Sequence, residues 1–297
     1  MELSTKKINH KTNLEFLGFT IPAVIAILLF VEIPFIMSVA YSFTRWNGLD
    51  RAPKFIGLEN YIELLTDDKV MVEALIFTFV FTLFFVVAVN VIALLLALVL
   101  DSKIFGRNAF RAAFYIPNII SLIVIGYIWR FIFSNGFESL GKLTEAGIFQ
   151  LSWLGDGKMA FISVILVSVW QATGFYMVIY IAGLQTVPRE LVEAATIDGA
   201  GSVKRFISVV FPLIMPSVTV CVFYAISNGF KIFDIILSLT FGGPGTATTS
   251  IALDIYKTAF NDNRFGYGAA KSVLLFAIIL AVTVFQLTIF KKREVEV

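Results

Sequence analysis

The chain has 297 residues, of which 58% are hydrophobic and only 15% are charged. Soluble proteins carry about a quarter charged residues, so this composition excludes an ordinary soluble domain and favours an integral membrane protein. The formal net charge of +2 gives no concentrated basic surface for nucleic acid. One Cys and one His, Cys221 and His10, are too few for a metal cage or a disulfide.

The chain begins with a polar and basic tail over residues 1–15, which lacks the small-residue cleavage site expected after a signal peptide. The first apolar stretch is therefore expected to remain in the protein, with an outer loop, as one segment over 16–71. A transmembrane core over 72–290 and a tail over 291–297 complete the predicted organisation.

Six apolar stretches reach the length of about 20 residues that a membrane-spanning helix needs. The sequence therefore predicts an all-α integral membrane protein with six transmembrane helices. The predicted spans cover residues 16–43, 72–100, 112–133, 160–184, 207–239 and 268–290.

Lys and Arg predict the orientation of these spans. Twelve of the 23 lie in the two tails and in the loops 101–111 and 188–205. These segments total only about fifty residues, and short loops rich in Lys and Arg stay in the cytoplasm. Because an even number of spans puts both termini on one side, we predict that both termini and the 188–205 loop are cytoplasmic.

Glu32 is the unusual residue of the first span, where it lies deep in the apolar run beside Pro34. A charge inside a membrane is costly and marks a site that needs a partner. Glu32 could accept a hydrogen bond from another helix or be protonated, and a structural role is favoured over transport chemistry.

Residues 136–143 come close to the phosphate-binding pattern G-x-x-x-x-G-K-[ST], but Leu143 replaces the hydroxyl residue that would hold Mg²⁺. The pattern also needs a preceding strand, whereas this copy follows a predicted membrane helix. We therefore predict no nucleotide site. With its single His in a tail, the chain also has no Ser/His/Asp or Cys/His set, which argues against an enzyme.

The segment 188–205 gathers more charge than any other between two apolar stretches. Glu190 and Glu193 favour the positive N-terminal end of a helix, and Gly199 or Gly201 can end it. The pattern predicts a short surface helix, a glycine corner and a second basic segment. Taken alone, the pattern favours an ordinary solvated loop, since solvated charge needs no partner.

The same segment resembles the EAA loop of binding-protein-dependent ABC importers, whose pattern is EAA, three residues, G, nine residues and I-x-L-P. Here the pattern is Glu193-Ala194-Ala195, then Gly199, then Val209-Val210-Phe211-Pro212, with two apolar replacements. The resemblance implies a type I importer permease fold with a cytoplasmic coupling helix between helices 4 and 5. It implies that Glu193 meets a basic residue of a separate ATPase. The implied coupling residues are Glu190, Glu193, Ala194, Ala195, Asp198, Gly199 and Pro212.

Other segments are similar to carbohydrate-uptake permeases of the maltose type. These segments are residues 41–46, 55–61, 116–118, 129–130, 239–246 and 264–268, so the resemblance covers almost the whole chain. It implies one permease subunit of a bacterial ABC sugar importer in the cytoplasmic membrane. The implied partners are a second, homologous permease, two ATPase subunits that bind ATP and Mg²⁺, and an extracytoplasmic sugar-binding protein. The chain itself is expected to bind no cofactor.

Polar and aromatic side chains in the fourth and fifth spans are candidates for the substrate path. Tyr224, Asn228 and Lys231 follow one helix face at i, i+4 and i+7. Sugar hydroxyls need hydrogen bonds, and sugar C–H faces pack on aromatic rings. Interhelical hydrogen bonds, worth about 0.6 kcal/mol each, are the alternative. The candidates are Trp170, Gln171, Tyr176, Tyr224, Ser227, Asn228 and Lys231, with Thr173 beside them.

Two other functions remain open at this point. An ABC permease for a sugar-like solute such as glycerol 3-phosphate would need a cation in its path, and Lys231 is available for that role. A secondary transporter driven by ions would need an intramembrane acid and an inverted repeat. We find no repeat in the sequence, and Glu32 is the candidate acid.

Overall fold

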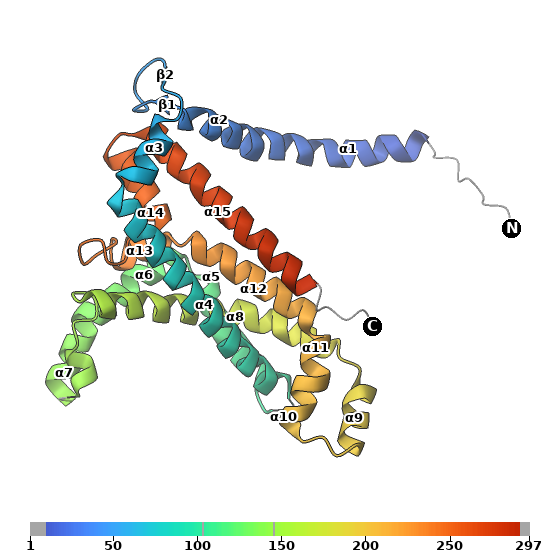
Figure 1. Ribbon diagram of the computed structural model, residues 1–297. Coiled ribbons are helices and arrows are strands. Elements are labelled where there is room, and N and C mark those ends of the chain that lie inside the picture. Colours follow the sequence, from blue (N-terminus) through green and yellow to red (C-terminus); the bar gives the residue numbers. More distant parts are fainter. Residues whose placement is uncertain (1–9, 103, 145, 292–297) are drawn as a thin grey trace. The chain divides into compact units, whose positions relative to one another are not determined.

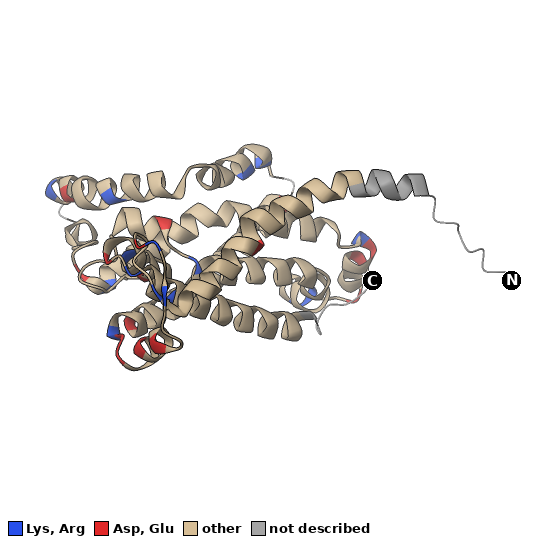
Figure 2. Ribbon diagram, turned by 90° about the horizontal axis from the view of Figure 1, so that it is seen from above, with Lys and Arg blue, Asp and Glu red and all other residues tan. Residues whose placement is uncertain are grey.

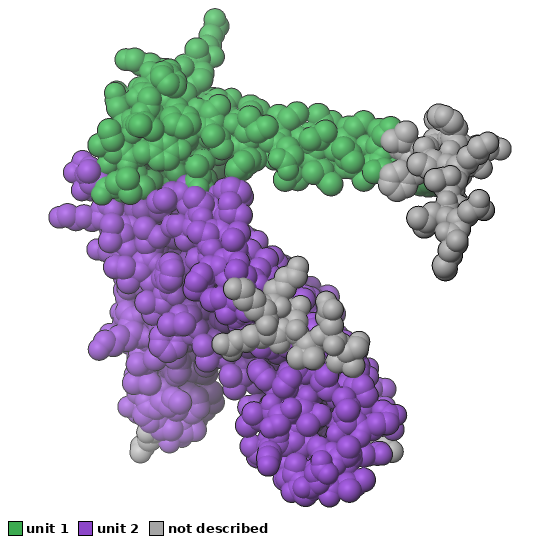
Figure 3. Space-filling view, turned by 45° about the vertical axis from the view of Figure 1, so that its right-hand side comes forward, with its two compact units in different colours: residues 1–65, 258–273 green, residues 66–257, 274–297 purple. Residues whose placement is uncertain are grey.

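A computed structural model describes residues 10–102, 104–144 and 146–291, which are almost entirely helical (Figure 1). The tail predictions for residues 1–9 and 292–297 lie outside these ranges. The described chain divides into two compact units, residues 1–65 with 258–273 and residues 66–257 with 274–297, coloured separately in Figure 3. We call them unit 1 and unit 2.

Unit 1 contains the first membrane helix, a hairpin and the start of the last helix. Its elements are α1 (His10–Ile27), the π-helical η1 (Leu28–Glu32), α2 (Ile33–Ser42), β1 (Thr44–Arg45), β2 (Lys54–Phe55), α3 (Glu59–Thr66), most of η5 (Lys257–Asn261) and the first turns of α15 (Phe265–Lys291). Asn60 of α3 donates hydrogen bonds to the carbonyls of Ser42 and Thr44, which holds the C-terminal end of α2 in place. Glu32 lies exposed in η1.

Unit 2 contains the remaining helices. They are α4 (Lys69–Asp101), α5 (Arg107–Ile119), α6 (Leu122–Phe131), η2 (Ile132–Gly136), α7 (Phe137–Thr144), η3 (Gly147–Gln150), α8 (Gly157–Gln185), α9 (Arg189–Ile197), α10 (Ser202–Arg205), η4 (Phe206–Val210), α11 (Phe211–Leu213), α12 (Met215–Phe230), α13 (Asp234–Leu239) and α14 (Ile251–Tyr256). The rest of α15 completes the unit.

Within the residues that the structure describes, four helices are long and apolar enough to cross a membrane, and they cover residues 18–42, 69–101, 157–185 and 265–290. They confirm four of the six predicted spans as continuous helices. Figure 2 shows that charged residues gather in loops and short helices, while the long helices are largely uncharged. This pattern fits segments whose middle parts lie in hydrocarbon.

The other two predicted spans, 112–133 and 207–239, are not continuous helices. Residues 107–119 and 122–144 form a pair bent by 97°, and residues 202–213 and 215–230 form a pair bent by 74°. Each bent pair counts as one membrane span only if both of its helices belong to the same crossing of the membrane. Pro117 and Pro212 precede the bends, and a proline removes a helical hydrogen bond. The helix of the fifth span also ends at Phe230, well before residue 239.

The core of unit 2 forms where α8 packs along α4, with α12 against α4 and α5 against α8. The buried stripe of α4 recurs every four residues, through Phe77, Phe81, Phe85, Val89, Ala93 and Ala97. Such spacing puts one side chain above another on a single helix face. The stripe changes from phenylalanine to alanine along its length, so the helices approach closely at one end and leave room at the other.

The loops rich in Lys and Arg lie at the same end of unit 2. Gln185, the last residue of α8, hydrogen-bonds Asp101 at the end of α4, and Arg111 of α5 donates to the carbonyl of Leu100 at 2.6 Å. Because α9 follows α8 after only three residues, the 188–205 segment begins at this end too. The start of α4 instead meets the 240–250 loop, where Thr246 donates to Glu73.

Candidate functional site

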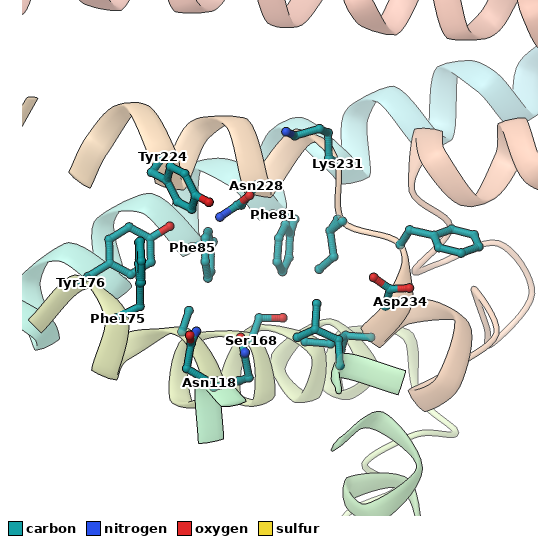
Figure 4. A pocket seen from close by; sticks show the side chains of 16 residues that line it. Phe81, Phe85, Asn118, Ser168, Phe175, Tyr176, Tyr224, Asn228, Lys231 and Asp234 are labelled. Carbon is teal, nitrogen blue, oxygen red and sulfur yellow. The ribbon is translucent and has the colours of Figure 1, made fainter. Parts of the chain in front are cut away.

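A cavity of about 360 Å³ lies between α8 and α12 in unit 2 (Figure 4). Its walls come from α4, the α5–α6 bend, α8, α12 and the break between α12 and α13. We call it the α8–α12 cavity. Its lining residues are Phe81, Phe85, Asn118, Leu122, Ser168, Gln171, Ala172, Phe175, Tyr176, Tyr224, Asn228, Lys231, Ile232, Phe233, Asp234 and Ile235.

Five of the seven predicted path residues line this cavity. Gln171 and Tyr176 come from α8, and Tyr224 and Asn228 come from α12, with Lys231 following the last turn of α12. Figure 4 shows Tyr224 and Asn228 facing Tyr176 across the cavity. The helical period of the fifth span therefore put its polar stripe on the face that lines the cavity.

Trp170 and Ser227 were also predicted for the path, but neither is among the residues that line the cavity. The ring of Trp170 is exposed and packs edge-on against Trp129, with 5.5 Å between the ring centroids. The lining residues of α8 are Ser168, Gln171, Ala172, Phe175 and Tyr176, which recur at spacings of three and four, and Trp170 falls outside this stripe.

Three polar lining residues were not predicted. Ser168 lies one helical turn before Gln171, so extending the period of the fourth span would have found it. Asn118 lies just before the α5–α6 bend, and Asp234 begins α13 after the helix break. No local pattern predicts these two, because the breaks in the helices bring them to the cavity.

Two hydroxyl groups in the cavity wall are buried without a well-formed hydrogen bond in the described part of the chain. Ser168 is 4% exposed and Tyr176 is 1% exposed; the Ser168 oxygen has no partner, and the Tyr176 hydroxyl interacts with the Asn228 amide without reaching good hydrogen-bond geometry. Tyr180, one turn further along α8, instead donates to Asn90 at 2.6 Å. Leaving a buried polar group without a hydrogen bond costs about 1–3 kcal/mol of free energy. Hydrogen bonds from a ligand to Ser168 and Tyr176 would therefore stabilise the complex with that ligand.

The charged lining residues of the cavity are one cation and one carboxylate, Lys231 and Asp234. Both lie at the break between α12 and α13, and their formal charges cancel. Amides, hydroxyls and aromatic rings form the rest of the polar wall. This chemistry suits an uncharged, hydroxyl-rich ligand better than an anion.

The 188–205 segment has the predicted helix and glycine corner. The helix α9 ends in a Schellman motif. The Ala200 N–H donates to the carbonyl of Ala195, and the Gly199 N–H donates to the carbonyl of Thr196. Gly199 has φ +77°, a conformation that glycine adopts without strain. Gly199, and not Gly201, therefore ends the helix.

The surface of α9 is free for a partner, because none of its residues is buried. Leu191 and Ile197 are exposed apolar side chains on it, and Ile197 is 87% exposed. Among the predicted coupling residues, Glu190, Glu193, Ala194, Asp198 and Gly199 are exposed, Ala195 is half-buried, and Pro212 is half-buried in α11. Exposed apolar side chains rimmed by polar residues can form the contact surface for a partner protein.

Sequence comparisons place the chain among transport proteins. Residues 89–294 match the family described as binding-protein-dependent transport system inner membrane component. The probable starch degradation products transport system permease protein AmyD of Thermoanaerobacterium thermosulfurigenes is 44% identical over 278 residues, 94% of both chains. The multiple sugar-binding transport system permease protein MsmF of Streptococcus mutans is 38% identical, over 93% of this chain and 95% of its own.

The fold is similar to that of a bacterial ABC transporter involved in the import of the acidic polysaccharide alginate. The TM-score is 0.81 with 18% identity, over 95% of this chain and 96% of the other. The alginate transporter in complex with an alginate pentasaccharide-bound periplasmic protein matches with a TM-score of 0.79, 19% identity and 93% of each chain. At this identity the likeness concerns the fold alone.

Proposed function

The chain belongs to the family of binding-protein-dependent transport system inner membrane components, and we propose that its own cargo is a sugar or oligosaccharide. It is a multi-pass membrane protein, a permease subunit of an ABC importer, and not itself an enzyme. The resemblance found in the EAA loop is thereby confirmed. A binding protein is its partner in transport, as the family description implies.

The α8–α12 cavity carries the proposal for a sugar. Its two buried hydroxyls, three amides and several aromatic rings match the hydroxyls and C–H faces of a saccharide. Starch fragments are the first sugars to test, since the relative of 44% identity is named for starch degradation products.

A permease for an anionic solute is the second candidate, because the sn-glycerol-3-phosphate permease UgpA of Agrobacterium fabrum is 30% identical over 92% of this chain. Recognition of a phosphate calls for a surplus of cations. Among the residues that line the cavity, Lys231 is offset by Asp234. The cavity therefore favours the neutral sugar. Because the chain belongs to a family of ABC importer permeases, we do not propose an ion-driven carrier. Glu32, the candidate acid for such a carrier, is not among the residues that line the cavity.

The arrangement suggests how ATP could drive the transport. We propose that α9 sits in a cleft of a cytoplasmic ATPase and that ATP and Mg²⁺ bind to two such ATPase subunits, with a second permease completing the membrane channel. In the chain, α9 lies between α8 and α12, the two helices that face each other across the cavity. A shift of α9 would displace both walls and open the cavity to one side of the membrane at a time.

Asn228→Ala and Gln171→Ala should each lower the maximal uptake of maltotriose per complex about two- to tenfold, because each removes one hydrogen bond to the sugar. The measurement is uptake into vesicles that contain the whole complex, normalised to purified complex. Basal ATP hydrolysis should stay normal, since both residues lie far along the chain from the coupling helix α9.

Ser227→Ala is the matched control, because Ser227 is the neighbour of Asn228 in α12 and does not line the cavity. Its uptake should equal that of the parent. Equal uptake by all three variants would contradict the assignment of the sugar to this cavity.

We propose that the protein lies in the cytoplasmic membrane with both termini and α9 on the cytoplasmic side. In a Cys221→Ala background, an impermeant thiol reagent applied to intact cells should label Leu49→Cys and Ala247→Cys but not Val203→Cys. All three positions are exposed. The reverse labelling pattern would mean that the orientation is inverted.

The nearby positions Asn47 and Gly245 are less suitable for labelling than Leu49 and Ala247, because both have structural roles. Asn47 accepts hydrogen bonds from the N–H groups of Leu49 and Asp50 through its side chain. Gly245 has φ +60°, where a cysteine would be strained. Disrupting either loop would make the labelling ambiguous.

A further inference from the structure

The coupling helix α9 is attached to the rest of unit 2 by two short links. Residues 186–188 join it to α8, and residues 198–201 join it to α10. The second link contains Gly199 and Gly201, and glycine restricts the backbone least of all residues. Because none of the residues of α9 is buried, packing alone holds it weakly. A helix so attached needs another contact to move as a rigid body with its neighbours.

One side-chain contact crosses the glycine corner. The Arg205 guanidinium of α10 donates from Nη1 to the Thr196 hydroxyl of α9, with 2.9 Å between the atoms. The same hydroxyl donates to the carbonyl of Val192, at 2.7 Å, so its donor and acceptor capacities are both used. Arg205 also donates its backbone N–H to the carbonyl of Gly201 at 2.9 Å.

The contact joins elements that lead to opposite walls of the cavity. Arg205 lies at the end of α10, which continues through η4 and α11 into α12. Tyr224 and Asn228 of α12 line the cavity. A hydrogen bond with a charged donor is stronger than a neutral one and fixes both direction and distance. It therefore restrains the angle between α9 and the segment that leads to α12.

We propose that Arg205 and Thr196 are positioning residues that make α9 and the α10–α12 segment move as one lever. The proposal rests on the assignment of α9 as the coupling helix. When the contact is intact, a displacement of α9 reaches α12; when it is absent, the corner at 198–201 bends and absorbs the displacement. Neither residue is expected to contact the sugar.

The test measures the flexibility of the lever directly. Spin labels on Arg189→Cys in α9 and Val220→Cys in α12, in a Cys221→Ala background, report the distance between the two helices in the purified complex in lipid nanodiscs. Thr196→Val keeps the side-chain shape but removes the hydroxyl. It should broaden the distribution of label distances by at least about twofold, because the hydrogen bond across the corner is lost.

Thr196→Ser retains the hydroxyl and should keep the narrow distribution of the parent. Arg205→Met should broaden the distribution as much as Thr196→Val does, and the double variant should be no broader than either single one, since both remove the same contact. A merely structural role of either side chain would lower the yield of complex without this non-additive pattern.

Two results would overturn the proposal: a distribution as narrow in Thr196→Val as in the parent, or a parent distribution that is already broad. The distances are measured without sugar, so they are independent of which solute the permease carries. If the assignment of α9 as the coupling helix is itself wrong, the result is different: a variant with the charge at Glu193 reversed shows normal uptake.

Discussion

Glu193→Lys should abolish uptake while the chain still inserts into the membrane. Glu193 is exposed on α9, one turn from the exposed side chain of Ile197. The resemblance to the EAA loop places a basic ATPase residue against it, and a lysine there would put two like charges together. Such a juxtaposition costs several kcal/mol, so we expect uptake per complex to fall about 100-fold or more.

The measurement is uptake and ATP hydrolysis in vesicles that contain the whole complex. ATP hydrolysis should no longer respond to the sugar-loaded binding protein. Glu138→Lys is the matched control, since Glu138 is also an exposed glutamate of a short helix, and its one ion pair, with Lys142, is solvated. Its uptake should be unchanged. Parental uptake by Glu193→Lys would show that α9 is not coupled through this carboxylate.

Gly174→Ala should strongly destabilise unit 2. A Cβ atom at Gly174 would overlap the carbonyl oxygen of Phe114 and lie 2.7 Å from the Cα of Tyr115. Both are backbone atoms of α5, which cannot move aside as a side chain could. Overpacking typically costs about 1–3 kcal/mol, and we expect the upper end or more because two helix backbones must separate.

Thermal unfolding of the purified complex tests this expectation. Gly147→Ala is the control, because a Cβ atom there has no heavy atom within 4 Å. It should leave the unfolding temperature unchanged, whereas Gly174→Ala should lower it by several degrees. Equal unfolding temperatures for both variants would mean that α5 and α8 do not approach as closely as the structure has them.

Local patterns in the amino-acid sequence were enough to predict the class of protein and its local elements. Long apolar runs identify the four continuous spans, because burial in hydrocarbon requires about 20 apolar residues in a row. The stripe of Tyr224 and Asn228 and the corner at Gly199 were also predicted correctly. Each depends only on residues within two or three helical turns, where the period of the helix and the conformational freedom of glycine decide the outcome.

Only the tertiary structure decided which residues form the cavity. The bends after Ile119 and at Ile214 bring Asn118 to the cavity wall and redirect the start of α12, while the break after Phe230 brings Asp234 there. Hydropathy cannot reveal such bends, because a bent helix is as apolar as a straight one. It also cannot separate Trp170, which faces outward, from Gln171, which faces the cavity. In a membrane both the lipid-facing and the protein-facing sides of a helix are apolar, so only the packing of α4, α8 and α12 determines which side meets the ligand.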